Sequence, residues 1–465
     1  MSRTLTLPQL DDRVLSTLNA DGTRRWMDPR EVRGPWRRRR MWTAWTLIVL
    51  FTLLPWIRID GKPPILLDVL SRKFTVFGAT FRPTETALVA VVLAIVFTGV
   101  FLITAVAGRV WCGWICPQTV YLEFVYRPLE RLLRGRGKAV PAWRRVLVLA
   151  TFLVVSAHLA NTFLAYFVGT DRLTQWTWRN PAEHPTAFAV FAVVTALMMF
   201  DFAFFREQLC TLVCPYGRLQ SALLDRDSLI VAYDHRRGEP RGAAAVQRAA
   251  VVRGERPGDC VDCHWCVQVC PTGIDIRQGL QMECLHCTQC MDACDAVMTK
   301  TGRLPGLIRY ASQRSVEGAG RSGTRWRVVL YALMLAGFVI LLLALLSSRP
   351  ATLAEQVRLP GLNFTERADG SIETPVRLLI ENRSELQRTY WVEGVGDVGL
   401  GAAVPSVAVE PAEAATLDFV VVTPSSGFLR GSRSGTVRVV DDSGATCDAR
   451  LQIVGPFTTQ RGGAR

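Results

Sequence analysis

Two cysteine runs, CVDCHWCVQVCP at residues 260–271 and CLHCTQCMDAC at residues 284–294, decide how the centre of this chain folds. In each run the four cysteines are separated by two, two and three residues. Bacterial ferredoxins use this spacing, and the fourth cysteine of one run ligates the cluster that the other run mainly holds. The two runs therefore predict two [4Fe–4S] clusters in one small α+β domain.

The exchange of the fourth cysteine determines the expected ligands. The first cluster is predicted to bind Cys260, Cys263, Cys266 and Cys294, and the second cluster Cys284, Cys287, Cys290 and Cys270. Zinc is the alternative, because cysteines two residues apart also bind zinc. Zinc ribbons do not need the third and fourth cysteines at these offsets, so iron–sulfur ligation is favoured. His264, Trp265 and His286 lie inside the runs and are expected to pack over the clusters.

Apolar stretches indicate that the chain also crosses a membrane. It has 465 residues, of which 49% are hydrophobic and only 20% are charged. A helix needs about 20 apolar residues to cross a bilayer. Candidate spans lie at 41–57, 86–107, 146–168, 186–204 and 326–348. The net charge of +14 fits an anionic membrane surface, because arginines flank the spans, and no nucleic-acid partner is expected.

The basic residues between the spans predict the orientation. Lys and Arg number ten in 1–40, eight in 108–145, five in 58–85 and two in 169–185. The positive-inside rule places 1–40, 108–145 and 205–325 in the cytoplasm. An odd number of spans then sends 349–465 outside, which in a bacterium is the periplasm. Twelve of the thirteen cysteines would lie on the cytoplasmic side of the inner membrane, where thiols stay reduced.

These observations divide the chain into five expected parts. They are a basic segment 1–40, four spans within 41–204, a cytoplasmic region 205–325 with a ferredoxin core at 255–300, a fifth span 326–348 and a C-terminal domain 349–465. In the last part, 375–380, 415–422 and 435–440 alternate apolar and polar residues between Gly, Pro, Asp and Ser clusters. That rhythm predicts an all-β sandwich of immunoglobulin type. The expected fold class is a transmembrane α-helical bundle with a ferredoxin insert and a β sandwich.

A second cysteine motif, CxxxCP, follows the second and the fourth predicted spans. The two copies comprise Cys112, Cys116 and Pro117, and Cys210, Cys214 and Pro215. Helical patterns come after both prolines, so Cys116 and Cys214 are expected to be N-caps, with thiol pKa values lowered by the helix dipole. Converging thiolates would suit Cu(I), zinc or an iron–sulfur cluster. The alternative is that these cysteines are small buried residues at helix breaks.

Weaker candidates lie near these motifs. His158 is the one histidine at membrane depth, so an intramembrane haem held by two histidines is not expected. Asp201, Glu207 and Glu123 would tune a cation site or serve as solvated charges at span ends. Cys447 is expected to be a buried small residue.

Together the motifs resemble the FixG/CcoG (RdxA-type) family of cytochrome c oxidase accessory proteins. The resemblance rests on WCGWICPQTVYLEFVYRPLE at 111–130, CPYGRLQ at 214–220, DHRRGEPRG at 234–242 and the double cysteine run. It implies a bacterial inner-membrane polyferredoxin, a metal-reductase type of oxidoreductase that converts Cu(II) to Cu(I) while cbb-type oxidases mature. The CxxxCP cysteines would be the copper ligands. Assembly factors or copper carriers would be the partners, with an unidentified electron donor.

Two other functions fit the same motifs. One is an electron-transfer subunit of a quinol dehydrogenase, as in NapH-like and NosR-like membrane ferredoxins. The expected external β domain counts against it, because a pure electron carrier does not need such a domain. The other is a non-catalytic copper chaperone or assembly scaffold.

Overall fold

The structure is a computed structural model that describes most of the chain. The described residues are 16–19, 21–59, 63–68, 73–76, 79–81, 86–135, 140–254, 256–319, 325–348, 350–357, 364–384, 386–401, 406–411 and 413–456. The chain divides into two compact units, Met1–Leu342 and Leu343–Arg465.

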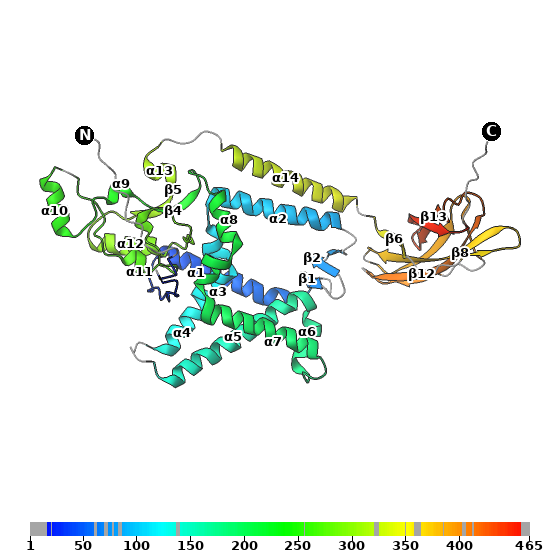
Figure 1. The fold of residues 1–465 in the computed structure, drawn as a ribbon, viewed down its shortest axis with the longest axis horizontal. Coiled ribbons are helices and arrows are strands. Elements are labelled where there is room, and N and C mark those ends of the chain that lie inside the picture. Colours follow the sequence, from blue (N-terminus) through cyan, green and yellow to red (C-terminus); the bar gives the residue numbers. More distant parts are fainter. Residues whose placement is uncertain are drawn as a thin grey trace. The chain divides into compact units, whose positions relative to one another are not determined.

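Long helices form the frame of the first unit (Figure 1). They are α1 (Pro35–Leu53), α2 (Thr86–Ala107), α5 (Ala142–Val168), α7 (Pro185–Phe200) and α14 (Trp326–Ser347). In the described part of the chain, four helical segments are long and apolar enough to cross a membrane. They are Ala87–Ala107, Ala142–Val168, Pro185–Phe205 and Trp326–Ser347. Four of the five predicted spans therefore coincide with apolar helices.

The first predicted span differs from the helix that forms there. We expected it at 41–57 after a polar segment, but α1 begins at Pro35 and contains the four arginines 37–40. Proline suits the first helical turn because its missing N–H is not needed there. The backbone N–H groups of Trp36 and Arg37 also find a partner in the carboxylate of Asp292, at 3.1 and 2.7 Å. The basic run therefore forms the N-terminal part of α1. Helix α1 is not among the four apolar segments.

The long helices pack in pairs. Figure 1 shows α5 beside α7 and α2 beside α14, where the rings of Phe101 and Tyr331 are 6.1 Å apart. Near α5 and α7, the ring of Tyr126 stacks on Phe202 at 4.3 Å and meets the edge of Phe152 at 4.9 Å. Such aromatic pairs add stabilisation beyond the apolar area that they bury.

Short elements connect the long helices. They are η1 (Leu54–Trp56), β1 (Ile65–Asp68), β2 (Lys73–Val76), β3 (Ala79–Phe81), η3 (Trp111–Ile115), α3 (Pro117–Tyr121), η4 (Leu122–Tyr126), α4 (Arg127–Arg134), α6 (Thr170–Trp178), η5 (Asp201–Phe205), η6 (Leu209–Val213) and α8 (Pro215–Leu223). Strands β1, β2 and β3 form an antiparallel sheet. The helices predicted after Pro117 and Pro215 are both present, and the first continues to Arg134.

The cysteine runs fold with a two-stranded sheet. The elements are β4 (Leu229–Tyr233), α9 (His235–Gly238), α10 (Ala244–Val252), α11 (Trp265–Gln268), η7 (Ile276–Gln278), α12 (Gln289–Lys300), β5 (Ile308–Ser312) and α13 (Gln313–Glu317). Strands β4 and β5 pair antiparallel, with Val231 opposite Tyr310. The core extends beyond the predicted 255–300, because Val231 and Ile308 are buried in the same cluster as Cys266 and Cys284.

The second unit is all β. Its strands are β6 (Thr352–Val357), β7 (Thr365–Glu366), β8 (Ser371–Asn382), β9 (Arg388–Gly394), β10 (Gly399–Leu400), β11 (Val407–Val409), β12 (Ala414–Pro424), β13 (Ser432–Asp441) and β14 (Thr446–Val454). They form two sheets, in the orders β10-β12-β8-β6, with β7 on β8, and β11-β9-β13-β14. The alternating segments predicted as strands lie in β8, β12 and β13. Leu378 from one sheet and Val439 from the other share one buried core, against which Cys447 packs.

Candidate metal centre

The first predicted ligand set lines one cavity. Its cysteines are Cys260, Cys263, Cys266 and Cys294, and Tyr233 and Arg277 are among the other residues that line it. Cys260 and Cys263 precede α11, Cys266 lies within α11, and Cys294 comes from α12 of the other run. The structure thus brings together the four cysteines that the spacing predicted, including the exchanged one.

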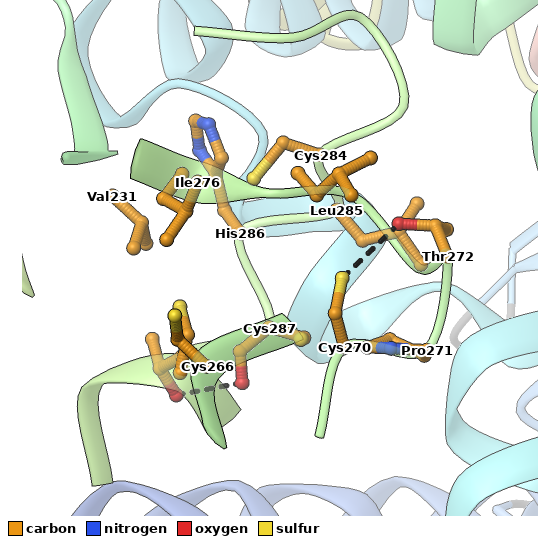
Figure 2. Close-up of a pocket in the computed structure, with 13 residues that line it drawn as sticks. Val231, Cys266, Cys270, Pro271, Thr272, Ile276, Cys284, Leu285, His286 and Cys287 are labelled. Atoms are coloured by element: carbon orange, nitrogen blue, oxygen red, sulfur yellow. Dashed lines mark hydrogen bonds between the residues drawn. The ribbon is translucent and has the colours of Figure 1, made fainter. Parts of the chain in front are cut away.

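The second predicted ligand set lines another cavity (Figure 2). Its cysteines are Cys270, Cys284, Cys287 and Cys290, and Cys266 also reaches this wall, so the two cavities adjoin. The sulfur of Cys270 is 3.4 Å from the hydroxyl of Thr272. Four thiols in an apolar cavity match the donor set of a [4Fe–4S] cluster, which supplies one-electron transfer when bound.

The two runs share an unusual backbone. Asp262 and His264 in the first run have φ values of 54° and 55°, and His286 and Thr288 in the second have 53° and 63°. These residues occupy the same places relative to the first cysteine of each run. Left-handed backbone is uncommon outside glycine and costs free energy unless its surroundings enforce it. We infer that these turns shape each loop around a cluster.

Burial sets the protonation of the cysteines in the two cavities when no metal is bound. Burial raises the pKa of Cys266, Cys284 and Cys294 to about 12 in each case. These side chains are therefore neutral thiols at pH 7 in the metal-free protein. Ligation needs thiolates, so cluster assembly must release protons.

The CxxxCP motifs have identical local structures. Cys112 lies in the π-helical turn η3 and Cys210 in the π-helical turn η6. The amide of Cys116 donates to the carbonyl of Trp111 and that of Cys214 to Leu209, at 2.8 Å in both copies. Each second cysteine is then the N-cap of the next helix, as predicted. π-Helical turns are rare and concentrate at functional sites.

The predicted effect of the helix N-terminus on these thiols is wrong for the first motif. Burial raises the pKa of Cys112 to about 12. Burial also raises the pKa of Cys116, although the backbone N–H groups of Thr119 and Gln118 oppose it. For Cys210, burial raises the pKa as well. Loss of hydration outweighs both the helix N-terminus at Cys116 and the charge of Arg109 near Cys112, because burial of a thiolate is costly.

The two motifs lie next to each other, as the topology predicted. Cys210 packs against the buried cluster that contains Cys112. Ionisation of Cys214 would raise the pKa values of Cys112 and Cys116 in the other motif. The Cys112 thiol donates to the side-chain oxygen of Gln220 on α8 at 3.0 Å. Within the described residues, no three His, Cys, Asp or Glu side chains are grouped closely enough to hold a single metal ion. We call these four thiols the thiol pocket.

The thiol pocket contacts the loop of the second cluster cavity. Cys112, Leu285 and Cys287 belong to one buried cluster, against which Cys210 packs. The Arg109 amide donates to His286 Nδ1 at 3.0 Å, and its guanidinium donates to the Cys284 carbonyl at 3.3 Å. The same guanidinium bonds the carbonyls of Met282 and of Gly217 on α8. Arg109 thus joins both CxxxCP motifs to the ferredoxin loop.

His286 is buried and neutral in this contact. Burial and the nearby Arg109 lower the pKa of His286 to about 3, which suits an acceptor at Nδ1. Its Nε2 has no hydrogen-bond partner although the residue is 0% exposed. Such an orphaned buried polar atom is unusual in a complete structure, and it lines the second cavity.

Two of the three acidic candidates are buried in ion pairs and are not solvated charges. Glu207 is 2% exposed and pairs with Arg24 at 3.3 Å and with Arg127 at 3.1 Å. Glu123 pairs with the same Arg127. Glu207 and Glu123 are therefore members of a buried ion-pair network and not solvated charges. Asp201 accepts a hydrogen bond from Gln118 at 3.1 Å.

Two histidines remain among the candidates, His158 and His264. The side chain of His158 is exposed on α5, and that of neighbouring Asn161 accepts from Thr177 at 3.3 Å. His264 lies by the first cavity, where its Nδ1 is 2.9 Å from Arg277.

Sequence reasoning missed the residues that join the two centres. Arg109 and Gln220 hydrogen-bond around the thiol pocket, and Gly113 lies against the carbonyl of Leu285. None of the three belongs to a metal-binding pattern. One signal was available for Arg109, which is a lone charge between an apolar span and a CxxxCP motif. No local signal marks Gln220, because its partner Cys112 is 108 residues away.

Comparison with known families agrees with this architecture. A family model described as a 4Fe-4S dicluster domain matches residues 205–313, and a 4Fe-4S binding domain matches 89–136. A model described as an IG-like fold at the C-terminal of FixG matches 342–456. The fold and the site therefore define a membrane-bound iron–sulfur protein of electron transport.

Relatives cover nearly the whole chain. Protein RdxA of Cereibacter sphaeroides is 34% identical over 91% of this chain and 92% of its own length. Nitrogen fixation protein FixG of Rhizobium meliloti is 31% identical over 94% of this chain and 95% of its own. A solved FixG-related protein from Vibrio parahaemolyticus covers 23% of this chain and 100% of its own, at 18% identity and a TM-score of 0.19. The chain belongs to the FixG/RdxA family.

Proposed function

We propose that this protein reduces Cu(II) to Cu(I) for the assembly of cbb-type cytochrome oxidase. In this account the two clusters hold single electrons, and copper at the thiol pocket accepts one of them. One observation carries the proposal: the loop of Leu285, His286 and Cys287 lies directly on the first CxxxCP motif. Such contact favours electron transfer, because a donor and an acceptor must be held close together.

The chemistry of the thiol pocket suits copper as a substrate. Sulfur ligands favour Cu(I) over hard cations, so ligation by Cys112 and Cys210 would stabilise the reduced product. Their raised pKa values mean that copper must displace protons to bind.

The sidedness of the molecule is part of the proposal. We place the clusters and the thiol pocket in the cytoplasm and the β unit in the periplasm, with α1 as a fifth span. The excess of basic residues in 1–40 and 108–145 supports this orientation. The two sheets of the β unit would form a sandwich of immunoglobulin type that binds oxidase assembly factors or copper carriers.

Copper binding and reduction test the role of the thiol pocket. The variants are Cys112→Ser and Cys210→Ser in the full-length protein, purified anaerobically in detergent. Cys447→Ser in the β unit is the matched control. We expect the pocket variants to keep their iron but to lose bound copper and cupric reduction, while the control keeps both. Unchanged copper reduction in both pocket variants would rule out this site.

An electron-transfer subunit of a quinol dehydrogenase is the second candidate. Ferredoxin-type protein NapH of Escherichia coli is 25% identical over 45% of this chain and 69% of its own length. Purified protein that reduces Cu(II) without a quinol supports the reductase. Reduction that requires a quinol and a partner dehydrogenase supports the second candidate.

A non-catalytic scaffold predicts a different pattern. Oxidase maturation would then survive Cys263→Ser, which removes a predicted cluster ligand, but not Cys214→Ser. The reductase account predicts that both substitutions abolish maturation.

A further inference from the structure

Arg40 is a buried cation that lacks a carboxylate partner. It lies on α1 and is 1% exposed. Its Nη1 donates to the carbonyl of Cys287 at 3.1 Å, whereas Nε and Nη2 have no hydrogen-bond partner. No ion pair found among the described residues includes it. The charge of Asp292 interacts with Arg40 without a direct contact. That carboxylate accepts hydrogen bonds from the N–H groups of Trp36 and Arg37 instead.

Such a charge needs a compensating anion. Burying a guanidinium in a low-dielectric interior is costly unless an opposite charge lies beside it. The neighbour here is Cys287, which lines the second cavity. A [4Fe–4S] cluster held by four thiolates carries net negative charge, so it would supply the missing counter-charge.

The first cavity has the opposite balance. Its guanidinium, Arg277, is 4% exposed and pairs with Asp275 at 2.7 Å and also with Asp262. Asp295 adds a further negative charge near Cys294. Among these charged residues, the three carboxylates near the first cavity outnumber the one guanidinium in its wall.

The second cavity has two buried guanidinium groups beside it, each bonded to the backbone carbonyl of one of its cysteines. Besides Arg40, Arg109 is 3% exposed and bonds the carbonyl of Cys284. Burial by itself disfavours the extra negative charge of a reduced cluster. The positive charges of the two guanidinium groups offset that penalty, because they favour the reduced cluster, which is more negative than the oxidised one.

We propose that Arg40 raises the reduction potential of the second cluster above that of the first. With clusters held by the cysteines of both cavities, one electron would pass from the first cavity to the second, with no bond broken and no proton moved. The exposed Cys263 makes the first cluster the point of entry, and the contact with the thiol pocket makes the second the point of exit. This direction rests on the proposed function, since both clusters must be present.

A redox titration followed by electron paramagnetic resonance tests this direction. The anaerobically purified full-length protein is compared with Arg40→Gln, which removes the charge, and Arg40→Lys, which keeps it. Arg39→Gln is the matched control, because Arg39 is exposed on the same helix and stacks on Trp36 at 4.9 Å. We expect Arg40→Gln to lower the higher midpoint alone. The equilibrium constant between the clusters should fall at least tenfold, about 59 mV for one electron.

The outcomes separate this inference from the assignment of the clusters. A lowered second midpoint in Arg40→Gln, together with wild-type midpoints in Arg40→Lys and Arg39→Gln, supports it. So does an Arg40→Gln protein that assembles one cluster when Arg40→Lys assembles both. Unchanged midpoints in Arg40→Gln would overturn it, and so would equal changes in the Gln and Lys variants. Wild-type protein without clusters would instead contradict the proposed function itself.

Discussion

Gly113 lies against the carbonyl oxygen of Leu285 so closely that a Cβ atom on Gly113 would be 2.5 Å from it. The carbonyl oxygen of His286 would be only 2.8 Å from the same atom. A side chain at this position is therefore incompatible with the contact between the first CxxxCP motif and the loop of the second cluster cavity. The glycine between Cys112 and Trp114 has a positional role that its motif does not reveal.

Replacement of Gly113 by alanine should separate the two centres. Overpacking of this kind costs about 1–3 kcal/mol, because the backbone must move. We expect Gly113→Ala to keep its iron, to unfold at a lower temperature and to transfer electrons to copper more slowly. Gly99→Ala on α2 is the control, since nothing lies within 4 Å of its Cβ position. Equal unfolding temperatures and rates in the two variants would refute the importance of this contact.

Exchange of ligands between the runs gives a second prediction. Cys270→Ser should remove the second cluster although Cys270 belongs to the first run, and Cys294→Ser should remove the first. Each variant should therefore hold about four irons, against about eight in the parent protein. Iron analysis with paramagnetic resonance measures this. Combination with Arg40→Gln identifies the remaining cluster, because only the second should respond.

Asp292 should stabilise the start of α1 from the ferredoxin side. Its carboxylate accepts the N–H groups of Trp36 and Arg37, which no group within the helix can satisfy. Removal of such a cap costs about 1 kcal/mol. We expect Asp292→Ala to lower the thermal unfolding midpoint, and Asp292→Asn to lower it less. Thr299→Ala, on the exposed face of α12, should leave it unchanged. An unchanged thermal unfolding midpoint in Asp292→Ala would show that the cap does not stabilise the protein.

Removal of the iron should expose the cysteines unequally. Cys263 is exposed, whereas Cys284 and Cys287 are 7% and 8% exposed. Alkylation of the native iron-free protein, located by mass spectrometry, should therefore modify Cys263 first. Labelling in guanidinium chloride is the reference, because unfolding makes all sites accessible. Uniform labelling under native conditions would mean that the two cavities unfold without iron.

The cysteine spacing predicted both cavities because ligand geometry is local. Cys260, Cys263 and Cys266 lie within one loop, and the chemistry of a cubane dictates where the fourth ligand must come from. The same holds for Cys116 and Cys214, since a proline at the first helical position determines the N-cap beside it.

The relation between the two centres could not be predicted in this way. Arg40 and Cys287 are 247 residues apart, and no periodicity links α1 to the ferredoxin loop. The arginine run 37–40 has the composition of a membrane-flanking segment, and only the fold turns one of its members inward. The prediction of a lowered pKa for Cys116 was wrong for a related reason. The sequence shows where the helix starts, but it does not show the burial that raises the pKa.

A single-turnover experiment tests the central claim most directly. The clusters of the anaerobic protein are reduced, the excess reductant is removed, and Cu(II) is added while the cluster absorbance and a Cu(I)-specific chelator are followed. We predict that the clusters reoxidise as Cu(I) forms, with one Cu(I) for each electron stored, and that Cys112→Ser abolishes the reaction. Clusters that stay reduced in the presence of Cu(II) would contradict the account.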